Sequence, residues 1–561
     1  MATFHEIETP DEALPEAPGA VPPGVPAIVL GGIGLALAAL IPYAVVAASG
    51  TGEEGSALAV VAKMRPWYEE RDPVPFTDLF QTSHDRPERP ELAAALKLAG
   101  EPGDGEDGGE EPLAPIVVDT SPPPVETAPA EPPTTAPGPD ANGSAVAPSE
   151  PPPTAKPVDP ITHIAIPEAA WEGITAEIED PNGAMGHFYE ALAKTALKEH
   201  GAVTRISQWG DSSIAADGMS SAARRLLQRQ FGDAGHGWSL IAAGTPWYKR
   251  KDIAWTTTGW HSMEFIRKDA PDGRYGYGGV AATGYQGATA TWKTVDDGPV
   301  GHAASRFEVH YLKDKRLGKL ALVVDDEEKA VVETAADAPE DAVAVVEVPD
   351  GPHTFKLKNV GGGLTRVYGA VIERTGVPGV VYDGIGVVGA RIARQLWIDE
   401  AHHEAAMKAR DPDLVIFTYG GNALVDKTSS ASYKADYVAV LKRYREALPD
   451  ASCVVMSPLD HDERYGRGYR TVARLHLLMK VQREAALENG CAWFSIYDAM
   501  GGDGSIGAWF EATPRLAEGD LAHPSAAGSR VLGSFWYKAL MKGFAGWIAA
   551  RKAAAEGGAA P

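Results

Sequence analysis

The sequence predicts an α/β fold in which helices cover both faces of a parallel sheet, giving three α/β/α layers. After position 161, and again after 375, short apolar strands alternate with amphipathic helices, a pattern typical of parallel sheets. Between 289 and 374 the hydrophobic period changes to two and no helical pattern intervenes. We therefore expect an antiparallel β-sandwich inserted into the α/β domain.

Changes in composition divide the 561 residues into eight expected segments. They are an acidic N-terminal tail (1–24), a transmembrane helix (25–48), a juxtamembrane segment (49–99), a Pro-rich disordered linker (100–160), the first part of the α/β domain (161–288), the inserted β-sandwich (289–374), the second part of the α/β domain (375–550) and a disordered C-terminal tail (551–561). The Pro-rich linker lacks the apolar residues that a core requires, so it should be a semi-extended tether.

The transmembrane prediction rests on the almost wholly apolar, uncharged run from Val25 to Ala48. A helix of this length can cross a hydrocarbon layer of about 30 Å. A buried soluble helix and a cleaved signal peptide are the alternatives, although the preceding residues lack the positive charge usual in signal peptides. Lys63, Arg65 and Arg71 follow the run and favour an outside N-terminus, which conflicts with an exported C-terminal domain.

The formal net charge of −25 argues against nucleic-acid binding, because phosphate contacts require clustered Lys and Arg side chains. The two cysteines, Cys453 and Cys491, each lie in an apolar run, so two buried thiols are favoured over a disulfide. No Cys/His spacing typical of zinc sites occurs, so no metal is expected. Two charged clusters are expected to be solvated helix surfaces: His402-His403-Glu404 and Arg224-Arg225.

The α/β elements are expected in a regular order on either side of the insert. The predicted helices are Gly186–His200, Ser213–Phe231, Ala390–Ala409, Ser432–Leu448, Arg470–Glu488 and a last helix from Pro524; the predicted strands are Thr204–Gln208, Leu414–Thr418, Ser452–Ser457 and Ala492–Tyr497. Polar motifs that follow these strands should gather at the carboxyl ends of the sheet, where ligands of such folds bind.

A candidate nucleophile, Ser212, lies in Gly210-Asp211-Ser212 at a strand-to-helix turn, which presents a hydroxyl at the end of the sheet. A hydroxyl needs a base, and His523 near the C-terminus is the candidate. Asp520, three residues earlier, can accept the Nδ1 proton and leave Nε2 for the serine. Each motif alone is weak, but their order and positions together indicate acyl transfer through a serine ester.

An oxyanion that develops on the substrate needs hydrogen-bond donors. Asn422 ends the run Tyr419-Gly-Gly-Asn422 after a strand, and glycines at 386 and 389 follow another short strand. A side-chain amide and a glycine N–H at these places could supply the donors. The alternative is two ordinary strand-end turns.

These four stretches occur in the order of the four sequence blocks of the SGNH (GDSL-like) hydrolases, which the chain resembles over about 200–550 outside the insert. The stretches ISQWGDSSIAADG and VYDGIGVVGAR resemble more narrowly the bacterial two-domain peptidoglycan O-acetylesterases, in which a carbohydrate-binding-module-like sandwich interrupts the catalytic domain. The resemblance implies a triad and three oxyanion donors without metal or organic cofactor. The implied triad is Ser212, Asp520 and His523, and the implied donors are Ser212 N–H, Gly389 N–H and the Asn422 side chain.

Two residues depart from the family pattern, which puts substrate preference and catalytic efficiency in question. Ala423 follows the asparagine where Asp or Glu is usual, and Ser213 follows the nucleophile where Leu or His is common. An aromatic-rich tract precedes the insert, and its rings could stack on sugars or pack in the core. Its members are Trp247, Tyr248, Trp255, Trp260, Tyr275, Tyr277 and Tyr285.

The leading hypothesis is a serine esterase that removes O-acetyl groups from a cell-envelope polysaccharide, with an acetylated glycan as substrate. The expected location is the bacterial inner membrane, held by the single N-terminal helix, with the catalytic domain on the periplasmic or exported side. One alternative is a polysaccharide O-acetyltransferase that uses the same triad, with a membrane acyltransferase as a possible partner. Another is a non-catalytic glycan-binding protein with a degenerate site.

Overall fold

The structure is a computed structural model and describes residues 89–100, 113–118, 159–466 and 468–557. The expected N-terminal tail and the predicted membrane span 25–48 lie outside these residues, as does most of the Pro-rich linker. Within the described residues, no helix combines the length and the apolar character needed to cross a bilayer.

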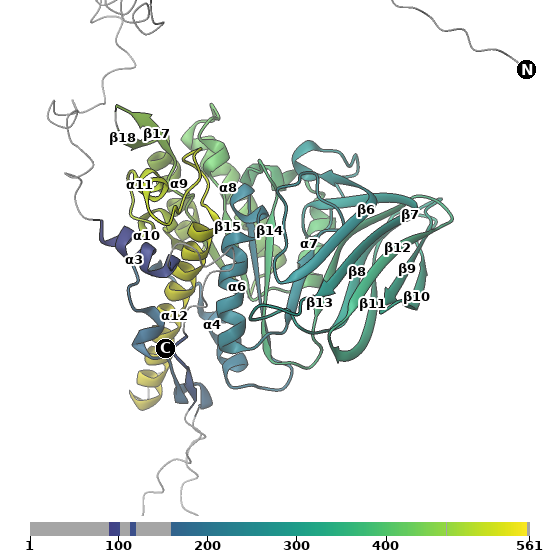
Figure 1. The fold of residues 1–561 in the computed structure, drawn as a ribbon, viewed down its shortest axis with the longest axis horizontal. Helices are drawn as coiled ribbons and strands as arrows, with labels where there is room; N and C mark the ends of the chain where they lie inside the picture. Colours follow the sequence, from purple (N-terminus) through teal and green to yellow (C-terminus); the bar gives the residue numbers. More distant parts are fainter. Residues whose placement is uncertain (1–88, 101–112, 119–158, 467, 558–561) are drawn as a thin grey trace, which may run out of the picture. The chain divides into compact units, whose positions relative to one another are not determined.

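A six-stranded sheet forms the centre of the α/β part (Figure 1). Its strand order is β14 (Gly379–Gly386), β4 (Val203–Gly210), β15 (Leu414–Thr418), β16 (Ser452–Met456), β19 (Ala492–Phe494) and β3 (Ile178–Glu179). The first five strands run parallel, and only the short β3 pairs antiparallel to its neighbour. The parallel sheet expected from the sequence is therefore confirmed, with one antiparallel strand at its edge.

Helices pack on both faces of this sheet because successive strand residues point to opposite sides. Ile206 and Ile416 face one core, whereas Trp209 and Phe417 face the other. The first core is covered by α4 (Gly186–Ala196), α6 (Gly218–Phe231) and α12 (Ala526–Gly557), and the second by α7 (Glu400–Arg410), α8 (Ser430–Ala447) and α9 (Arg474–Glu488).

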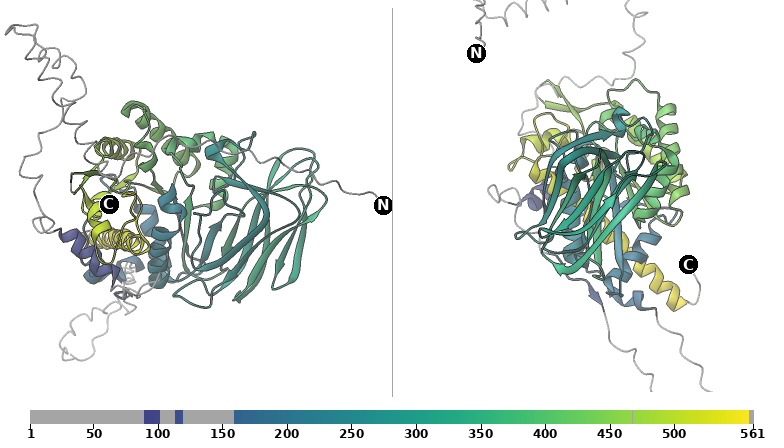
Figure 2. Two further views of the ribbon diagram at one scale, coloured as in Figure 1. Left: turned by 45° about the horizontal axis from the view of Figure 1, so that its top comes forward. Right: turned by 90° about the vertical axis from the view of Figure 1, so that its right-hand side faces the viewer.

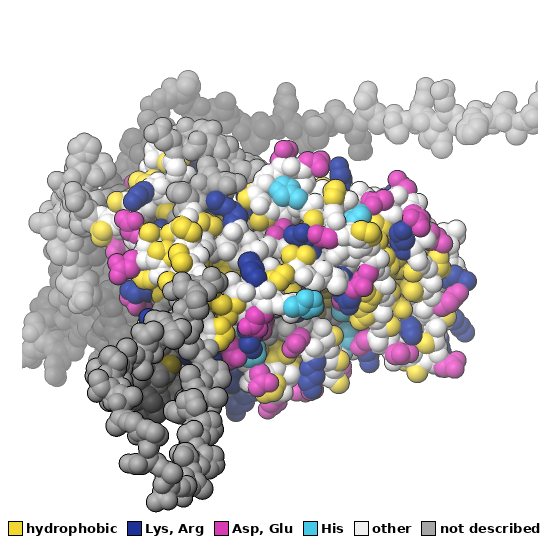
Figure 3. Space-filling model, turned by 90° about the horizontal axis from the view of Figure 1, so that it is seen from below, with side chains coloured by type: hydrophobic (Ala, Val, Ile, Leu, Met, Phe, Trp, Pro, Cys, Tyr) yellow, Lys and Arg dark blue, Asp and Glu magenta, His cyan; other side chains and the backbone are white. Residues whose placement is uncertain are grey.

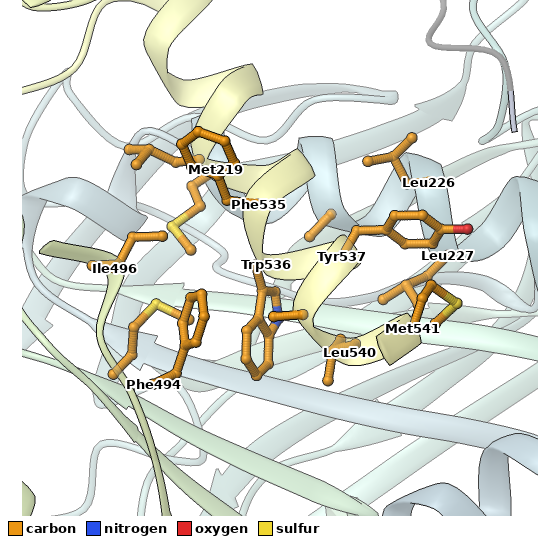
Figure 4. Close-up of a cluster of buried hydrophobic side chains, with 14 of the residues drawn as sticks. Met219, Leu226, Leu227, Phe494, Ile496, Phe535, Trp536, Tyr537, Leu540 and Met541 are labelled. Carbon is orange, nitrogen blue, oxygen red and sulfur yellow. The ribbon is translucent and has the colours of Figure 1, made fainter. Parts of the chain in front are cut away.

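The C-terminal helix α12 supplies much of the first core (Figure 4). Trp536 is fully buried and its ring packs on Phe494 at the end of β19, while α12 packs along α6. The labelled cluster comprises Met219, Leu226, Leu227, Phe494, Ile496, Phe535, Trp536, Tyr537, Leu540 and Met541. Since α12 continues to Gly557, the expected disordered tail 551–561 is wrong for most of its length.

Part of the segment before 161 also belongs to this folded unit. Helix α3 (Pro90–Ala99) buries Ala95 and Ala99 in the first core beside α12. Strand β1 (Val117–Val118), inside the expected linker, pairs with β2 (Ile164–Ala165). The sequence prediction placed the start of the folded part too late, because these short apolar pieces are separated by long polar stretches.

The second sheet has nine antiparallel strands and lies beside the first, where β5 contacts β14 (Figure 2). Its strands are β5 (Gly235–Ser239), β6 (Ile253–Glu264), β7 (Val280–Thr294), β8 (Ala304–Lys313), β9 (Lys319–Val324), β10 (Glu327–Glu333), β11 (Glu340–Gly351), β12 (Thr354–Gly361) and β13 (Thr365–Glu373). The pairing is continuous, because the first half of β7 pairs with β13 and the second half with β12. The expected sandwich is therefore one curved antiparallel sheet.

The antiparallel strands begin well before the expected position 289. Strand β6 and the first part of β7 lie in the tract that the sequence assigned to the α/β domain. The pairing of β6 shifts register between Thr258 and Trp260, and Gly259 between them has a positive φ of +74°. This bulge interrupts the alternation of side chains, so the strand does not show a clean period of two.

The two cysteines form a disulfide, which contradicts the prediction of two buried thiols. Cys453 lies on β16, and Cys491 immediately precedes β19. The two strands pair in parallel with Val454 opposite Ala492, so the preceding residues lie side by side. This register cannot be obtained from either apolar run alone.

Two predictions of solvated clusters are also wrong. Arg224 is fully buried, with ion pairs to Asp217 and Asp252. His402 and His403 on α7 are buried as well, since α7 packs against α8 and the antiparallel strands supply partners. Helical periodicity did not reveal these burials because the polar side chains find buried partners elsewhere in the chain.

Candidate active site

The turn after β4 holds Ser212 as the first residue of a one-turn helix, α5 (Ser212–Ala215). Asp211 caps this helix: its Oδ1 accepts hydrogen bonds from Ser213 N at 3.0 Å and Ser213 Oγ at 2.9 Å. Gly210 is needed for the turn, because a Cβ there would lie 2.3 Å from Cγ1 of Ile214. The strand-to-helix placement predicted for Ser212 is confirmed.

The predicted continuous helix from 213 to 231 is broken just after this turn, where Asp217 adopts a left-handed φ of +50° between α5 and α6. Its buried carboxylate accepts bonds from Arg224 Nη1 at 3.1 Å and Nη2 at 3.0 Å, and from Lys251 N at 2.8 Å. Burial opposes ionisation, but Arg224 and Arg250 outweigh it and lower the pKa of Asp217 to about 2. This ionised cluster fixes the break directly behind the serine turn.

The structure brings Ser212, His523 and Asp520 into one chain of hydrogen bonds. Ser212 Oγ lies 2.8 Å from His523 Nε2, and His523 Nδ1 lies 2.7 Å from Asp520 Oδ2. The backbone N–H groups of Ala522 and His523 also donate to Asp520 Oδ1, each at 3.1 Å. Nδ1–H therefore donates to the carboxylate, which leaves Nε2 as the acceptor that faces the serine hydroxyl.

The electrostatics of Asp520 suit this arrangement. Burial favours its neutral form, but hydrogen bonds from the His523 ring and from the two backbone N–H groups hold the pKa of Asp520 below its ordinary value. Asp520 is thus ionised at neutral pH and can stabilise an imidazolium on His523.

The predicted oxyanion donors lie close to this chain. Asn422 Nδ2 donates to Asp211 Oδ2 at 3.2 Å and to Ala390 O at 3.3 Å. Gly389 immediately precedes Ala390, with a positive φ of +80°. Within the described residues, the N–H groups of Ser212 and Gly389 have no hydrogen-bond partner. The backbone donors are therefore available, whereas Asn422 must release one of its two bonds to reach an oxyanion.

A cavity of about 210 Å³ opens beside Ser212 and His523. Its walls are formed by Asp211, Ser212, Ser213, Thr418, Tyr419, Gly421, Asn422, Pro458, Leu459, His461, Ala522 and His523. Pro458, Leu459 and His461 follow β16, and sequence reasoning did not include them. The position of a histidine just after a central parallel strand was the available signal.

The aromatic tract divides into two groups. Tyr285 and Trp247 are 69% and 70% exposed, and Trp247 lies two residues before Lys249, whose N–H donates to Ala215 O of the serine helix at 3.0 Å. Four of the other rings are buried: Tyr248, Trp260, Tyr275 and Tyr277. Core packing accounts for these four, and Trp255 is partly buried against the same core. Tyr285 and Trp247 are therefore the rings of the tract that are exposed enough to contact a ligand.

No group of three or more His, Cys, Asp or Glu side chains is placed to hold a metal ion in the part of the chain that the structure describes. Metal-independent chemistry stays a prediction. On the described part of the face shown in Figure 3, acidic and basic side chains are interspersed, unlike the basic stripe of a phosphate-binding surface.

Comparisons with known proteins agree with this geometry. The model of the GDSL-like lipase/acylhydrolase family matches residues 352–531, which contain Asn422, Asp520 and His523 but not Ser212. No curated protein matches the sequence. A solved structure titled "Peptidoglycan O-acetylesterase in action" is 22% identical with a TM-score of 0.56, and the match covers 65% of this chain and 99% of that one.

Two further solved structures are similar at TM-scores below 0.5. A family two carbohydrate esterase from Cellvibrio japonicus is 11% identical, covers 53% of this chain and 99% of its own, and has a TM-score of 0.22. The salicylyl-acyltransferase SsfX3 from a tetracycline biosynthetic pathway is 15% identical, covers 56% and 97%, and has a TM-score of 0.23.

Residues 352–531, in the second half of the α/β part, are similar to the GDSL-like lipase/acylhydrolase (SGNH) family, and the fold as a whole is similar to that of the solved O-acetylesterase structure.

Proposed function

We propose that this protein is a serine esterase that removes O-acetyl groups from a cell-envelope polysaccharide of the peptidoglycan kind. The observation that carries the proposal is the hydrogen-bonded chain from Ser212 through His523 to Asp520, with distances of 2.8 and 2.7 Å. This geometry also argues against a non-catalytic glycan-binding protein with a degenerate site.

The reaction follows from the positions of these atoms. Ser212 Oγ attacks the ester carbonyl while His523 Nε2 takes the hydroxyl proton, and Asp520 stabilises the imidazolium that forms. The N–H groups of Ser212 and Gly389 and the amide of Asn422 donate to the oxyanion. His523 then gives its proton to the departing sugar oxygen. In the second half of the reaction, water attacks the carbonyl of the acetyl-serine while His523 takes its proton, and Ser212 Oγ leaves with that proton as acetate is released.

The size of the cavity favours a short acyl group. At about 210 Å³ it is smaller than the 300–1,000 Å³ typical of pockets for drug-sized ligands, so a long fatty-acid chain would not fit within it. Asp211, Ser213 and Asn422 add polar atoms to its walls. An acetyl ester on a polar alcohol matches this size and polarity.

The glycan and the exported location are supported by two observations. The fold is shared with a protein whose structure is titled a peptidoglycan O-acetylesterase. The disulfide between Cys453 and Cys491 suits an oxidising compartment outside the cytoplasm, since disulfides are rare in cytosolic proteins. A periplasmic or exported catalytic unit held by the N-terminal apolar run remains the proposed location.

Acetate release from O-acetylated peptidoglycan tests the function. Wild type should release acetate, and Ser212→Ala should lose at least about 10³-fold in rate while keeping its thermal unfolding profile. A serine-reactive phosphonate should label wild type but not Ser212→Ala. Equal acetate release by both proteins would overturn the proposal.

Two additions to this experiment separate the remaining hypotheses. A glycan acceptor that accelerates turnover of an acetyl donor, with acetylated glycan as product, would favour an O-acetyltransferase. A reporter fused after Pro160 that is active only in the cytoplasm would contradict the exported location.

A further inference from the structure

A second histidine, His461, forms part of the cavity wall beside Ser212 and has no place in the reaction described above. It follows β16, at the same carboxyl edge of the parallel sheet that carries the serine turn and Asn422. Because the His461 side chain lines the cavity, it is placed to contact a substrate bound at Ser212.

The hydrogen bonds of His461 fix its tautomer. Its Nδ1 lies 2.9 Å from the carbonyl oxygen of Leu459, and a carbonyl oxygen only accepts, so Nδ1 carries a proton. In the neutral ring, Nε2 is then an acceptor. Nε2 forms no hydrogen bond with any other residue that the structure describes.

The ring is pressed against Gly421, immediately before Asn422. A Cβ at position 421 would lie 2.6 Å from His461 Nε2 and 2.9 Å from Cε1. The Nε2 edge of the ring therefore occupies the space that any larger residue at 421 would fill. The unused acceptor lies next to the candidate oxyanion site rather than on the outer surface.

Both neighbours of His461 hold its backbone in place. Asp460 Oδ1 accepts from Thr471 Oγ1 at 2.7 Å, and its other oxygen accepts from Ile506 N at 3.0 Å. On the other side, Asp462 Oδ2 accepts from Gly507 N at 3.0 Å. These buried carboxyl groups anchor the loop that carries His461.

The same loop is bonded to the segment that carries the catalytic pair. Asp462 N–H donates to the carbonyl oxygen of Leu521 at 3.0 Å, and Leu521 lies between Asp520 and His523 with a left-handed φ of +57°. The positions of His461 and His523 are thus coupled through backbone bonds. A preorganised acceptor at a fixed place beside the nucleophile is what substrate orientation requires.

We propose that His461 is a positioning residue that selects substrates carrying a hydroxyl or amide N–H next to the scissile acetyl ester, as acetylated sugars and amino sugars do. Its Nε2 accepts a hydrogen bond from that neighbouring donor and orients the ester carbonyl toward Ser212. The inference rests on the proposed esterase function. It specifies the recognition of the alcohol part of the substrate, and no proton transfer is assigned to His461.

The test compares two acetyl esters: O-acetylated muropeptides, which carry such donors, and 4-nitrophenyl acetate, which has none. For His461→Phe we expect kcat/KM on the muropeptides to fall about tenfold to a hundredfold, because an acceptor for the donor is lost. On 4-nitrophenyl acetate the change should stay within about threefold. His461→Gln, which keeps an acceptor oxygen, should recover part of the loss.

His302→Phe is the matched control, since His302 Nδ1 also lies 2.9 Å from a backbone carbonyl oxygen but lines no part of this cavity. It should leave both substrates unaffected. An equal loss on both substrates with His461→Phe, or no loss on muropeptides, would overturn the inference. If His461→Phe fails to fold, His461→Leu, which also lacks an acceptor, decides: a loss on the muropeptides alone supports the inference, and equal effects on the two esters overturn it.

Failure of the proposed function is separately visible in the same experiment. Wild type would then hydrolyse neither ester faster than Ser212→Ala. Hydrolysis of 4-nitrophenyl acetate alone by wild type would retain the esterase but overturn both the glycan substrate and the role of His461.

Discussion

An aspartate and a histidine pair closely in each of two regions, the edge of the parallel sheet and the loops of the antiparallel sheet. His523 Nδ1 lies 2.7 Å from Asp520 at the first, and His353 Nδ1 lies 2.6 Å from Asp325 at the second. The pairs are almost identical in distance. What differs is the partner of the other ring nitrogen.

His523 Nε2 faces a hydroxyl, whereas His353 Nε2 lies 2.8 Å from the carbonyl oxygen of Pro349. Two acceptors on one ring favour two N–H groups, and therefore favour the protonated form of His353. Burial opposes this charge, but the Pro349 carbonyl and Asp325 raise the pKa of His353. The ring beside Ser212 keeps a free acceptor and can act as a base.

A third aspartate–histidine pair joins helix α7 to the antiparallel sheet. His402 Nδ1 on α7 lies 2.6 Å from Asp341 on β11, and its Nε2 accepts the N–H of Gly276 at 2.7 Å. One donated and one accepted bond lock the neutral ring. An aspartate–histidine pair is therefore catalytic only where the second nitrogen meets a reactive group.

The largest effect is expected at the catalytic pair. Asp520→Asn should lower kcat on 4-nitrophenyl acetate by about 10³- to 10⁴-fold, because the amide cannot hold the Nδ1–H tautomer or stabilise the imidazolium. Asp325→Asn is the matched control and should change kcat by less than about twofold. A comparable loss of kcat in Asp520→Asn and Asp325→Asn would show that the two pairs do not differ in their role in catalysis.

The linking pair should matter for stability instead. Asp341 accepts bonds from His402 Nδ1, Arg274 Nη1 at 2.7 Å and Tyr368 Oη at 2.6 Å. Asp341→Asn places an amide hydrogen against one of these donors, so the free energy of unfolding should fall by about 1–3 kcal/mol. Urea denaturation measures this fall, and kcat should be unchanged.

Asp326→Asn provides the comparison for that stability change. Asp326 is 89% exposed and bonds only to Lys356 in the described structure, at 3.1 Å, so its loss should cost less than about 0.5 kcal/mol. Similar unfolding midpoints for the two variants would show that the His402 link carries no stability.

Asp460 and Asp462 form a carboxyl pair for which the described residues supply no basic partner, and this sharpens the contrast. Burial and the adjacent Asp460 raise the pKa of Asp462 to about 7, so the folded pair still holds a proton in mildly acidic solution, where an exposed carboxyl is ionised. The unfolded carboxyl titrates near 3.9, so this stabilising contribution is complete below that pH and is lost as pH rises toward 7. The loss amounts to at most about 1.4 kcal/mol per pH unit.

Asp462→Asn, which mimics the protonated acid, should flatten this dependence. The measurement is the free energy of unfolding between pH 4 and pH 8 for both proteins. Wild type should lose stability relative to the variant as pH rises. Parallel curves would show that the pair does not retain the proton.

The sequence was sufficient where the signal is local. Leu414–Thr418 is a strand with the expected bounds, because four apolar residues followed by a β-branched threonine are typical of a strand buried on both faces. Ser212 and His523 were found because each motif lies at an element boundary. Their 2.8 Å contact follows from the parallel order of the strands and the return of the C-terminal segment to the same sheet edge.

The sequence failed where a partner lies far along the chain. His402 depends on Asp341, 61 positions away, and no helical pattern reveals that carboxylate. The disulfide depends on the register of two parallel strands, and His461 gains significance only from Gly421 beside it. Whether a polar residue is buried depends on such distant partners, so hydrophobic periodicity alone cannot predict it.

The smallest effect is expected at the cationic pair of the antiparallel sheet. Its folded pKa is raised, so the contribution of His353 is complete below the unfolded value of about 6.5 and is lost as pH rises through the folded value. Because Asp325 is 53% exposed, solvent screening limits the effect to under about 1 kcal/mol. The difference in Tm between wild type and His353→Gln should therefore be largest below about pH 6.5 and shrink as the pH rises through the folded pKa, with esterase activity unchanged. A constant difference across this range would mean that His353 stabilises the loops by packing, and its contrast with His523 would then rest on position rather than on charge.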